Sequence, residues 1–175
     1  MNRPWIGACL ALGLLVSGCV TGGGRTSQSH IPSAWPTDKG YPVTSVFGPR
    51  QDPLTRALKN HNGLDIAAPN KSDVFAAGAG RVCYSGRTDN GYGNLIGIDH
   101  GNGLESWYAH LSKRKAKVGR RVDQGQVIGK VGKTGRATAP HLHFEVRHQG
   151  KPIDPALYIA AEPRVRVARE EGGVP

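Results

Sequence analysis

Histidines and acidic residues gather in two short segments that lie far apart in the chain. The first is His61-Asn62-Gly63-Leu64-Asp65, and the second is His141-Leu142-His143-Phe144-Glu145. In an extended strand, successive side chains point to opposite faces. The first segment then places His61 and Asp65 on one face, and the second places both of its histidines on one face together with Glu145. Each segment therefore offers metal-ligand groups on a single side of a strand.

The donor types favour zinc over other metals. Imidazole nitrogen and carboxylate oxygen are ordinary zinc ligands, whereas an iron–sulfur centre or a closed structural zinc site would need several thiolates. Three protein ligands leave a fourth position for water, which is the pattern of catalytic zinc sites. A His-x-His pair alone is only moderately specific. The two segments together, in a chain of short β segments, predict one catalytic zinc ion.

The elements that must position these groups are short strands. Apolar runs separated by Gly, Asn and Asp recur through residues 41–160, and helical periodicity is nearly absent. This pattern predicts an all-β domain, a compact sandwich or barrel-like fold of glycine-rich antiparallel sheets with a zinc-holding groove. We expect strands within Val43–Phe47, Gly63–Ala67, Val74–Ala77, Arg81–Tyr84, Leu95–Asp99, Ser106–Leu111, Val127–Val131 and Leu142–Arg147.

Motifs in a fixed order cover nearly the whole of this domain. They are Val43-Thr44-Ser45-Val46-Phe47-Gly48, His61-Asn62-Gly63-Leu64-Asp65-Ile66, Gly91-Tyr92-Gly93-Asn94, Tyr108-Ala109-His110-Leu111, Gly132-Lys133-Thr134-Gly135 and His141-Leu142-His143-Phe144-Glu145-Val146. In these motifs the chain resembles the LytM/lysostaphin-type metallo-endopeptidases, many of which are called peptidoglycan DD-metalloendopeptidases. The resemblance implies a LytM-type β domain, one zinc ion, and hydrolysis of peptide cross-links in bacterial peptidoglycan.

The resemblance also assigns the residues of the site. The metal ligands of the family correspond to His61, Asp65 and His143, and its two catalytic histidines that do not bind metal correspond to His110 and His141. The resemblance therefore implies that a three-ligand zinc site and two further imidazoles share one groove.

Two histidines would replace the glutamate base of other zinc proteases, because the chain has no His-Glu-x-x-His helix. A histidine with a pKa of about 6.5 suits proton transfer at neutral pH. We expect His110 and His141 to act jointly as general base and as stabilisers of the developing oxyanion, and the sequence does not divide these roles. Alternation along the strand would place Ser106 and Tyr108 on the same face as His110. Glu145 is expected to orient its neighbours rather than to bind zinc.

Residues 1–18 have the pattern of a secretory signal. Arg3 gives a positive start, and the apolar run that follows is shorter than the roughly 20 residues a membrane-spanning helix needs. Val16-Ser17-Gly18-Cys19 resembles the lipobox of bacterial lipoproteins, which implies that Cys19 is lipidated and becomes the new N-terminus. In Gram-negative lipoproteins an aspartate after this cysteine would signal retention in the inner membrane, so with Val20 at this position the resemblance implies the outer membrane.

The chain is therefore expected to be an exported protein that is lipid-anchored in the outer membrane and faces the periplasm. Its membrane contact would be through the lipid anchor only. Residues 19–40 are rich in Gly, Ser, Thr and Pro and are expected to form a flexible tether. Residues 41–160 would be the metallo-endopeptidase domain and residues 161–175 a flexible tail.

The formal charge of +10 favours anionic partners. The export signal and the absence of a recognisable binding motif disfavour nucleic acid, whereas peptidoglycan peptides carry free carboxylates and suit the expected location. The sequence leaves the oligomeric state open. Cys83 has no disulfide partner in the mature domain, and the apolar run around it predicts a buried thiol.

Two other classes of protein were weighed. Some relatives of this type have lost metal ligands and only activate other wall hydrolases, but every expected ligand and both accessory histidines are present here. The glycine-punctuated segment from Val118 to Gly135 also looks like a biotinyl or lipoyl carrier hairpin. The biotin type needs a lysine that typically lies between methionines, and the sole methionine is Met1.

Overall fold

The computed structural model describes residues 30–38, 40–51 and 55–159. Within these residues the regular structure is β-strand apart from one 3₁₀ turn, η1 (Pro155–Leu157). The strands are β1 (Val43–Ser45), β2 (Gly48–Gln51), β3 (Leu58–His61), β4 (Leu64–Ile66), β5 (Asp73–Phe75), β6 (Gly80–Thr88), β7 (Gly93–Asp99), β8 (Leu104–Ala109), β9 (Lys113–Arg114), β10 (Arg121–Val122), β11 (Val127–Lys130), β12 (Leu142–His148) and β13 (Lys151–Ile153).

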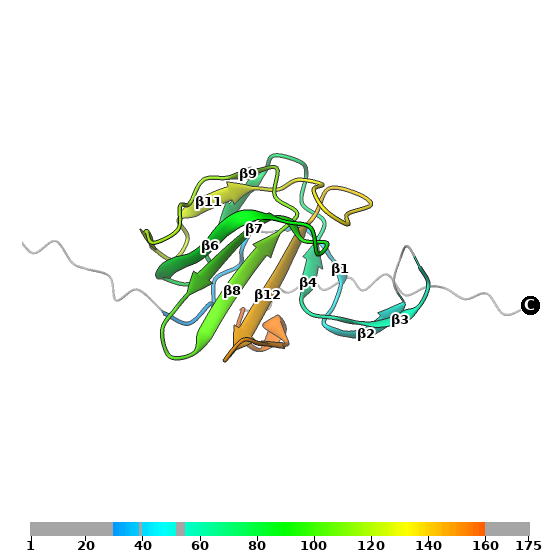
Figure 1. Cartoon of the computed structure of the whole chain (residues 1–175), viewed down its shortest axis with the longest axis horizontal. Coiled ribbons are helices and arrows are strands. Elements are labelled where there is room, and N and C mark those ends of the chain that lie inside the picture. Colours follow the sequence, from blue (N-terminus) through cyan, green and yellow to red (C-terminus); the bar gives the residue numbers. More distant parts are fainter. Residues whose placement is uncertain (1–29, 39, 52–54, 160–175) are drawn as a thin grey trace, which may run out of the picture.

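An eight-stranded antiparallel sheet forms the body of the domain. Its strand order is β1-β4-β12-β8-β7-β6-β10, and β13 pairs with the end of β12. A second antiparallel sheet of β5, β11 and β9 covers part of it, and β2 pairs with β3 in a separate hairpin (Figure 1). The all-β antiparallel class expected from the sequence is confirmed.

The hydrophobic core lies between the main sheet and the smaller sheet. Leu142 and Phe144, on one face of β12, are fully buried, and the ring of Tyr108 from β8 packs against Phe144 with centroids 5.3 Å apart. The smaller sheet contributes Val74 and Ile128. Because side chains alternate along a strand, the intervening residues of β12 point to the other face, where a polar site can form.

Each of the eight expected β segments overlaps a strand of the structure. The strands that the pattern missed are β2, β3, β9, β10 and β13, which are short and mostly exposed. Such strands lack the alternation of buried and exposed residues on which the prediction rests. Among the strands that were not predicted, β2 and β3 matter for function, because His61 lies at the end of β3. They form the hairpin that projects to the right in Figure 1.

Part of the expected tether is packed against the domain. The backbone N–H of Ala34 donates to Ala77 O at 2.9 Å, and Pro36 O accepts from the N–H of Phe75 at 2.9 Å. Trp35 is partly buried against the core. The prediction of a flexible tether up to residue 40 is therefore wrong for this stretch. It rested on the content of Gly, Ser, Thr and Pro and did not consider the apolar surface that Trp35 can bury. Residues 1–29 and 160–175, with the expected signal, Cys19 and tail, lie outside the described residues.

Cys83 is exposed, so the prediction of a buried thiol is wrong. Cys83 follows the buried Val82 in β6, so alternation along the strand turns its side chain outward, and the register shift between Val82 and Tyr84 leaves it without a cross-strand partner on β7. The prediction took the apolar residues around Cys83 as one buried run and did not apply this alternation. Among the described residues there is also no helix with the length and hydropathy needed to cross a membrane.

Gly63 lies directly before β4, against the backbone of the paired strand β12. A Cβ atom at this position would lie 2.2 Å from Phe144 O and 2.9 Å from Phe144 C. These are backbone atoms of a central strand, which cannot move aside without disturbing the sheet. Only glycine therefore allows the chain to bend between β3 and β4 at this close approach.

We expect Gly63→Ala to lower the free energy of unfolding by about 1–3 kcal/mol, the usual cost of overpacking a close contact. Urea unfolding followed by circular dichroism measures this change. Gly86→Ala is the matched control, because the three atoms nearest to the added methyl group all belong to the end of the Tyr84 side chain, which can move. Equal stability of the Gly63 and Gly86 variants would contradict the packing argument.

Candidate metal and catalytic site

His61 and Asp65 do not lie on one strand, as the sequence analysis assumed. His61 ends β3, Asp65 lies in β4, and the chain bends at Asn62 and Gly63 between them. Residues four apart in one strand would be separated by about 13 Å, too far to share an ion. The bend instead brings His61 Nε2 to 3.1 Å from Asp65 Oδ1. The expected pairing of these side chains is therefore present, but the bend produces it rather than strand alternation.

Three donor atoms meet at one point on the polar face of the main sheet. Asp65 and His143 are directly opposite each other on β4 and β12. His143 Nδ1 lies 2.8 Å from Asp65 Oδ1 and 3.1 Å from His61 Nε2. Ligands of a tetrahedral zinc ion are about 3.3 Å apart when zinc–ligand bonds are near 2.0–2.1 Å. The three residues can therefore hold a zinc ion with little adjustment.

The donor set requires a positive charge at its centre. His61 Nδ1 donates to Val46 O at 2.7 Å, so a neutral His61 presents a lone pair at Nε2. That lone pair, Asp65 Oδ1 and His143 Nδ1 would repel one another without a cation or a proton between them. Burial opposes the charged form of His143, but hydrogen bonds to Asp65 and Glu145 raise the pKa of His143 to about 9. A proton on His143 or a metal ion can each supply the charge.

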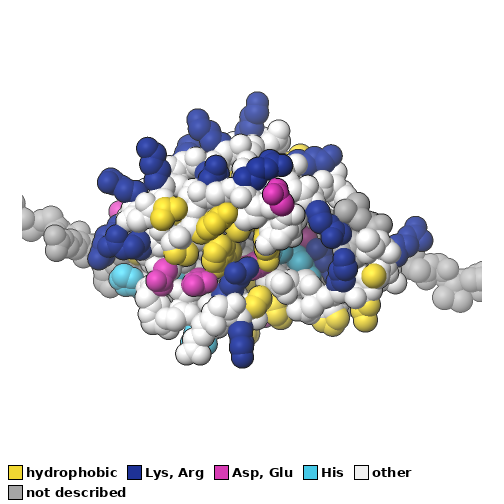
Figure 2. Space-filling view, viewed as in Figure 1, with side chains coloured by type: hydrophobic (Ala, Val, Ile, Leu, Met, Phe, Trp, Pro, Cys, Tyr) yellow, Lys and Arg dark blue, Asp and Glu magenta, His cyan; other side chains and the backbone are white. Residues whose placement is uncertain are grey.

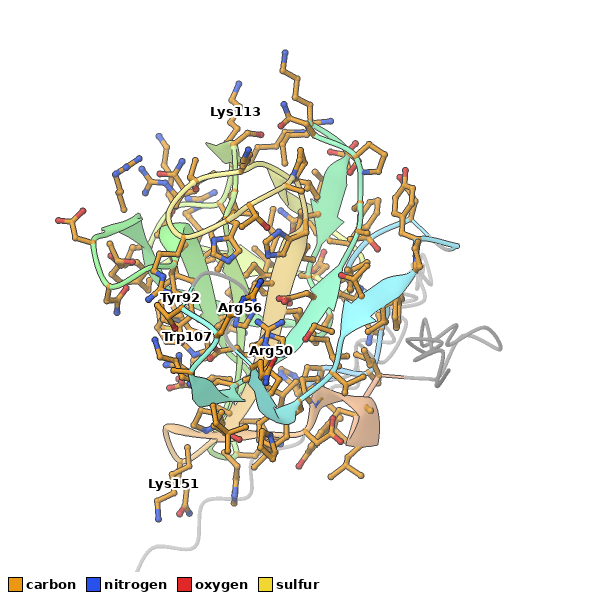
Figure 3. The ribbon with its side chains drawn as sticks, turned by 90° about the vertical axis from the view of Figure 1, so that its right-hand side faces the viewer. Arg50, Arg56, Tyr92, Trp107, Lys113 and Lys151 are labelled. Atoms are coloured by element: carbon orange, nitrogen blue, oxygen red, sulfur yellow. The ribbon has the colours of Figure 1, made fainter. Side chains whose placement is uncertain are left out.

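Arg50 holds the second oxygen of Asp65. Its Nη1 lies 3.1 Å from Asp65 Oδ2 and also bonds Ser45 Oγ. Arg50 comes from β2 and is close to the centre of the view in Figure 3. With Oδ2 engaged by the guanidinium, Oδ1 is the carboxylate oxygen turned towards the two histidines. Although burial opposes the charged form of Asp65, the neighbouring imidazoles of His143 and His61 keep the pKa of Asp65 below its ordinary value.

Glu145 fixes the far side of His143. Its side chain is fully buried, and Oε1 accepts from His143 Nε2 at 2.9 Å. This bond places the Nε2 proton of His143 away from the donor set and leaves Nδ1 for the metal. Burial raises the pKa of a carboxyl group, but the bond from His143 keeps the pKa of Glu145 below its ordinary value. Glu145 orients a ligand, as the sequence analysis expected.

Glu145 is itself clamped by Tyr92 and Arg147. Tyr92 donates its hydroxyl to Glu145 Oε1 at 2.6 Å, and Arg147 Nη2 lies 2.6 Å from Oε2. The guanidinium of Arg147 also stacks on the ring of Trp107, 4.5 Å from its centroid. Figure 3 shows Tyr92 and Trp107 beside each other on this face. A continuous chain of contacts therefore runs from Trp107 to His143.

His110 and His141 lie beside the three donor atoms. Their ring centroids are 4.6 Å apart, and His141 Nε2 is 3.7 Å from Asp65 Oδ1. His110 Nδ1 donates to Thr134 O at 2.8 Å, and His141 Nδ1 donates to Ala139 O at 2.9 Å. When neutral, each ring therefore has its proton on Nδ1 and a lone pair on Nε2. Both are held as bases.

The backbone of His110 explains how it reaches the groove. Its φ of 60° lies in the left-handed region, which is uncommon for a residue other than glycine. The expectation that Ser106 and Tyr108 share its face is wrong. Both are fully buried in the core, where the hydroxyl of Tyr108 accepts from the N–H of Ala77 at 2.8 Å. The left-handed turn after β8 directs His110 to the polar side instead.

His110 is neutral at neutral pH. Burial, followed by the neighbouring imidazoles of His141 and His143, lowers the pKa of His110 to about 4. The lone pair on its Nε2 is then available at neutral pH. A base that is already unprotonated needs no separate activation step.

These side chains line a groove with a cavity volume of about 460 Å³. Its walls come from β1 and β2, from the loop before β7, and from the loop between β11 and β12. A volume of this size is within the range of roughly 300–1,000 Å³ that is usual for ligand sites. The groove is therefore large enough for an extended peptide segment next to the donor atoms.

The sequence analysis missed three of the supporting residues. The alternation that places His143 and Glu145 on one face also reaches Arg147, so this signal was available. Tyr92 had a weaker signal in the Gly91-Tyr92-Gly93 punctuation. Arg50 had none, because its approach to Asp65 depends on the unpredicted hairpin β2–β3.

A β domain that places a three-donor metal site and two further imidazoles in one groove is the architecture of a metal-dependent hydrolase. Comparison with protein families gives the particular group. The model for peptidase family M23 matches residues 59–155, and the chain belongs to this family.

Two curated relatives illustrate the similarity. The chain is 42% identical over 126 residues to the DD-carboxypeptidase/endopeptidase Mpg of Neisseria meningitidis, which covers 72% of this chain and 29% of that protein. It is 39% identical over 136 residues to the lipoprotein YgeR of Escherichia coli, covering 77% of this chain and 54% of that protein. The chain thus spans under a third of Mpg and about half of YgeR.

Solved structures agree with this family. A zinc-containing peptidase from Vibrio cholerae superposes with a TM-score of 0.66 at 38% identity, covering 72% of this chain and 39% of that one. The catalytic domain of lysostaphin from Staphylococcus simulans gives a TM-score of 0.60 at 35% identity, covering 66% of this chain and 89% of that domain. Together with the donor set, these relatives identify zinc as the cofactor.

We expect Glu145→Gln to weaken zinc binding by about 10–100-fold, the usual effect of removing a partner of a metal-binding histidine. The glutamine amide has a single oxygen, so its NH2 group would face either Arg147 or the pair Tyr92 and His143, and it cannot satisfy all three neighbours. Competition with a chromophoric chelator measures the affinity. The absorption spectrum of the cobalt-substituted protein reports the ligand geometry.

Glu105→Gln is the matched control for this experiment. Glu105 lies on the neighbouring strand β8 and accepts from Trp107 Nε1 at 2.8 Å rather than from His143. The same loss of charge there should leave zinc affinity and the cobalt spectrum close to wild type. An equal loss of zinc affinity in the two variants would mean that the affinity depends on the negative charge of this face, and not on the contact between Glu145 and His143.

Proposed function

We propose that this chain is a zinc-dependent endopeptidase that hydrolyses the peptide cross-links of bacterial peptidoglycan. The observation that carries the proposal is the close approach of two further imidazoles, His110 and His141, to the donor atoms of His61, Asp65 and His143. A site that only stored metal, or only stabilised the fold, would not need two further bases. Membership of peptidase family M23 and the resemblance to Mpg support the same reaction.

We propose that zinc is held by His61 Nε2, Asp65 Oδ1 and His143 Nδ1. When bound, zinc would polarise the scissile carbonyl and lower the pKa of its water to about 7. His143 is kept in the correct tautomer by Glu145, and Asp65 is kept in place by Arg50. These contacts hold the donor atoms before substrate arrives, which reduces the reorganisation needed during the reaction.

His110 and His141 handle the protons. Thr134 O and Ala139 O hold their Nδ1 protons, so the lone pairs on their Nε2 atoms can accept a proton from the attacking water. The same proton can then be donated to the leaving amine. A protonated imidazole beside the substrate also stabilises negative charge that develops on the carbonyl oxygen. With both rings next to Asp65 and His143, the site can provide a base and an oxyanion partner at the same time.

We expect His110→Ala and His141→Ala to lower the rate of cross-link cleavage by about a hundredfold to ten-thousandfold, the usual contribution of a general acid–base group. Both variants should keep their zinc, because neither residue supplies a donor atom. The assay is cleavage of a defined cross-linked muropeptide dimer, followed by mass spectrometry, with the zinc content of each protein determined in parallel.

His148→Ala is the control, because this exposed histidine lies at the end of β12, away from the groove. The variant should cleave the dimer at the wild-type rate. If wild-type protein bound zinc but released no fragments from dimers or sacculi, the endopeptidase proposal would be overturned. An activator of other wall hydrolases would then be favoured. Cleavage at wild-type rate by His110→Ala would refute its role as a base.

We further propose that the chain is exported and anchored by lipid at Cys19, facing the periplasm from the outer membrane. The order of charged, apolar and small residues in residues 1–18 supports export, and the lipobox-like Val16-Ser17-Gly18-Cys19 supports lipidation. The similarity to YgeR, described as a lipoprotein, points the same way. A tethered enzyme of this kind would meet its substrate within reach of the membrane.

Cys19→Ser should abolish incorporation of labelled fatty acid and release the protein into the soluble fraction. Cys83→Ser is the matched control, because this exposed thiol plays no part in the anchor and its variant should stay labelled and membrane-bound. Membrane fractionation and labelling in cells measure both outcomes. Continued labelling of Cys19→Ser would exclude this residue as the anchor.

A further inference from the structure

A dense run of positive charge lies outside the groove. Residues 113–121 contain six Lys and Arg residues and no acidic residue. The six, which we call the basic surface, are exposed in the structure; they are Lys113, Arg114, Lys115, Lys117, Arg120 and Arg121. The segment starts in β9, at the edge of the smaller sheet, and ends in β10, at the edge of the main sheet. One charged strip therefore crosses the edges of both sheets.

The fold places like charges directly opposite each other in this region. Lys113 on β9 is the cross-strand partner of Lys130 on β11. Asp73 offsets part of this charge, with its Oδ1 2.9 Å from Lys130 Nζ and 3.4 Å from Lys115 Nζ. A single carboxylate thus serves two ammonium groups and leaves Lys113 facing a like charge. Like charges in directly opposed positions destabilise a sheet.

A second like-charge pair lies at the other end of the segment. Arg121 on β10 is the cross-strand partner of Arg81 on β6, whose other neighbour in the sheet is Asp99. The guanidinium of Arg81 donates to Gly119 O at 2.7 Å, so it is bound to the basic segment itself. Two like-charge pairs at separate sheet edges, each offset only on one side, oppose stability. Local choices that lower stability without a structural gain are typical of functional surfaces.

The basic surface and the groove face different directions. Figure 2 shows Lys and Arg side chains gathered over the edge that carries β9 and β11. In Figure 3 Lys113 points away at the top, whereas Arg50 marks the groove near the centre of the view. None of the six residues is among those that line the groove. A ligand on the basic surface would therefore leave the groove open.

We propose that the basic surface is a second docking site for the carboxylate-bearing wall polymer, separate from the groove that cuts it. This inference rests on the proposed function, because it takes the same polymer as the partner. Peptidoglycan repeats free carboxylates along its peptides, and an extended strip of exposed cations matches such a spread of charge. Binding one peptide at the strip would raise the local concentration of neighbouring cross-links at the groove.

The composition of the strip favours a polymer over a lipid surface. Proteins that bind the membrane interface through such a surface combine cations with aromatic or large aliphatic side chains that enter the lipid. The large exposed apolar residue of this segment is Val118, and the segment contains no aromatic residue. Its remaining exposed side chains are charged. The test must therefore distinguish binding to wall polymer from binding to anionic lipid.

The test compares two triple variants with equal loss of charge. Arg114→Gln, Lys117→Gln and Arg120→Gln together remove cations whose side chains pair with no other described residue, so folding should be preserved. Lys71→Gln, Arg87→Gln and Lys151→Gln together are the control, because they remove three exposed cations elsewhere on the surface. Both are made in the full chain, and circular dichroism checks that both fold.

We expect the basic-surface variant to bind purified sacculi about tenfold more weakly than wild type at low salt, the scale of an electrostatic attraction. Wild-type binding should fall to the same level as salt is raised, or when the carboxylates of the sacculi are amidated. The control variant should bind as wild type does. Cleavage of a soluble muropeptide dimer should be equal in all three proteins, whereas the basic-surface variant should digest sacculi more slowly.

Equal binding of the two triple variants to sacculi would overturn the proposal. So would wild-type binding to vesicles containing phosphatidylglycerol without charge-dependent binding to sacculi, which would assign the strip to lipid. Failure of the wild-type protein to cleave the soluble dimer would overturn the proposed function. The binding result would still stand, because co-sedimentation does not depend on cleavage.

Discussion

The site depends on the need for positive charge among three acceptors. His61, Asp65 and His143 approach one another to about 3 Å, a spacing that lone pairs tolerate only around a cation or a proton. The surrounding bonds fix which atoms face inwards. Val46 O holds the far side of His61 and Glu145 holds the far side of His143. The polar face of the sheet is thus organised around a positive charge. The three side chains do not supply this charge while both histidines are neutral.

That requirement explains why supporting residues extend far from the donor atoms. Glu145 is a buried carboxylate, and it is tolerated because Arg147 and Tyr92 satisfy its oxygens. Arg147 in turn lies on the ring of Trp107. Gly97 allows this stacking, since a Cβ there would lie 2.9 Å from the indole. The position of a metal-binding nitrogen is therefore tied to packing two strands away from β12.

The sequence carried the chemical groups but not their geometry. Residue types indicated metal ligands in the two segments that contain His61 and His143, the family resemblance chose the three ligands, and alternation correctly joined His143 to Glu145. Alternation failed where the backbone departed from a regular strand, as at the bend near Gly63 and the left-handed turn at His110. Arg50 could not be found, because its contact with Asp65 depends on a hairpin with no alternating pattern. Long-range pairing, which local pattern does not encode, decided these positions.

The hairpin β2–β3 pairs only within itself, yet it carries His61 and Arg50. The other two donors, Asp65 and His143, belong to the main sheet. An ion bound by all three would act as a cross-link between a protruding arm and the body of the domain. Metal loading would then be a mechanical event as well as a chemical one: it would restrain the arm, shield its backbone from proteolysis and fix one wall of the groove.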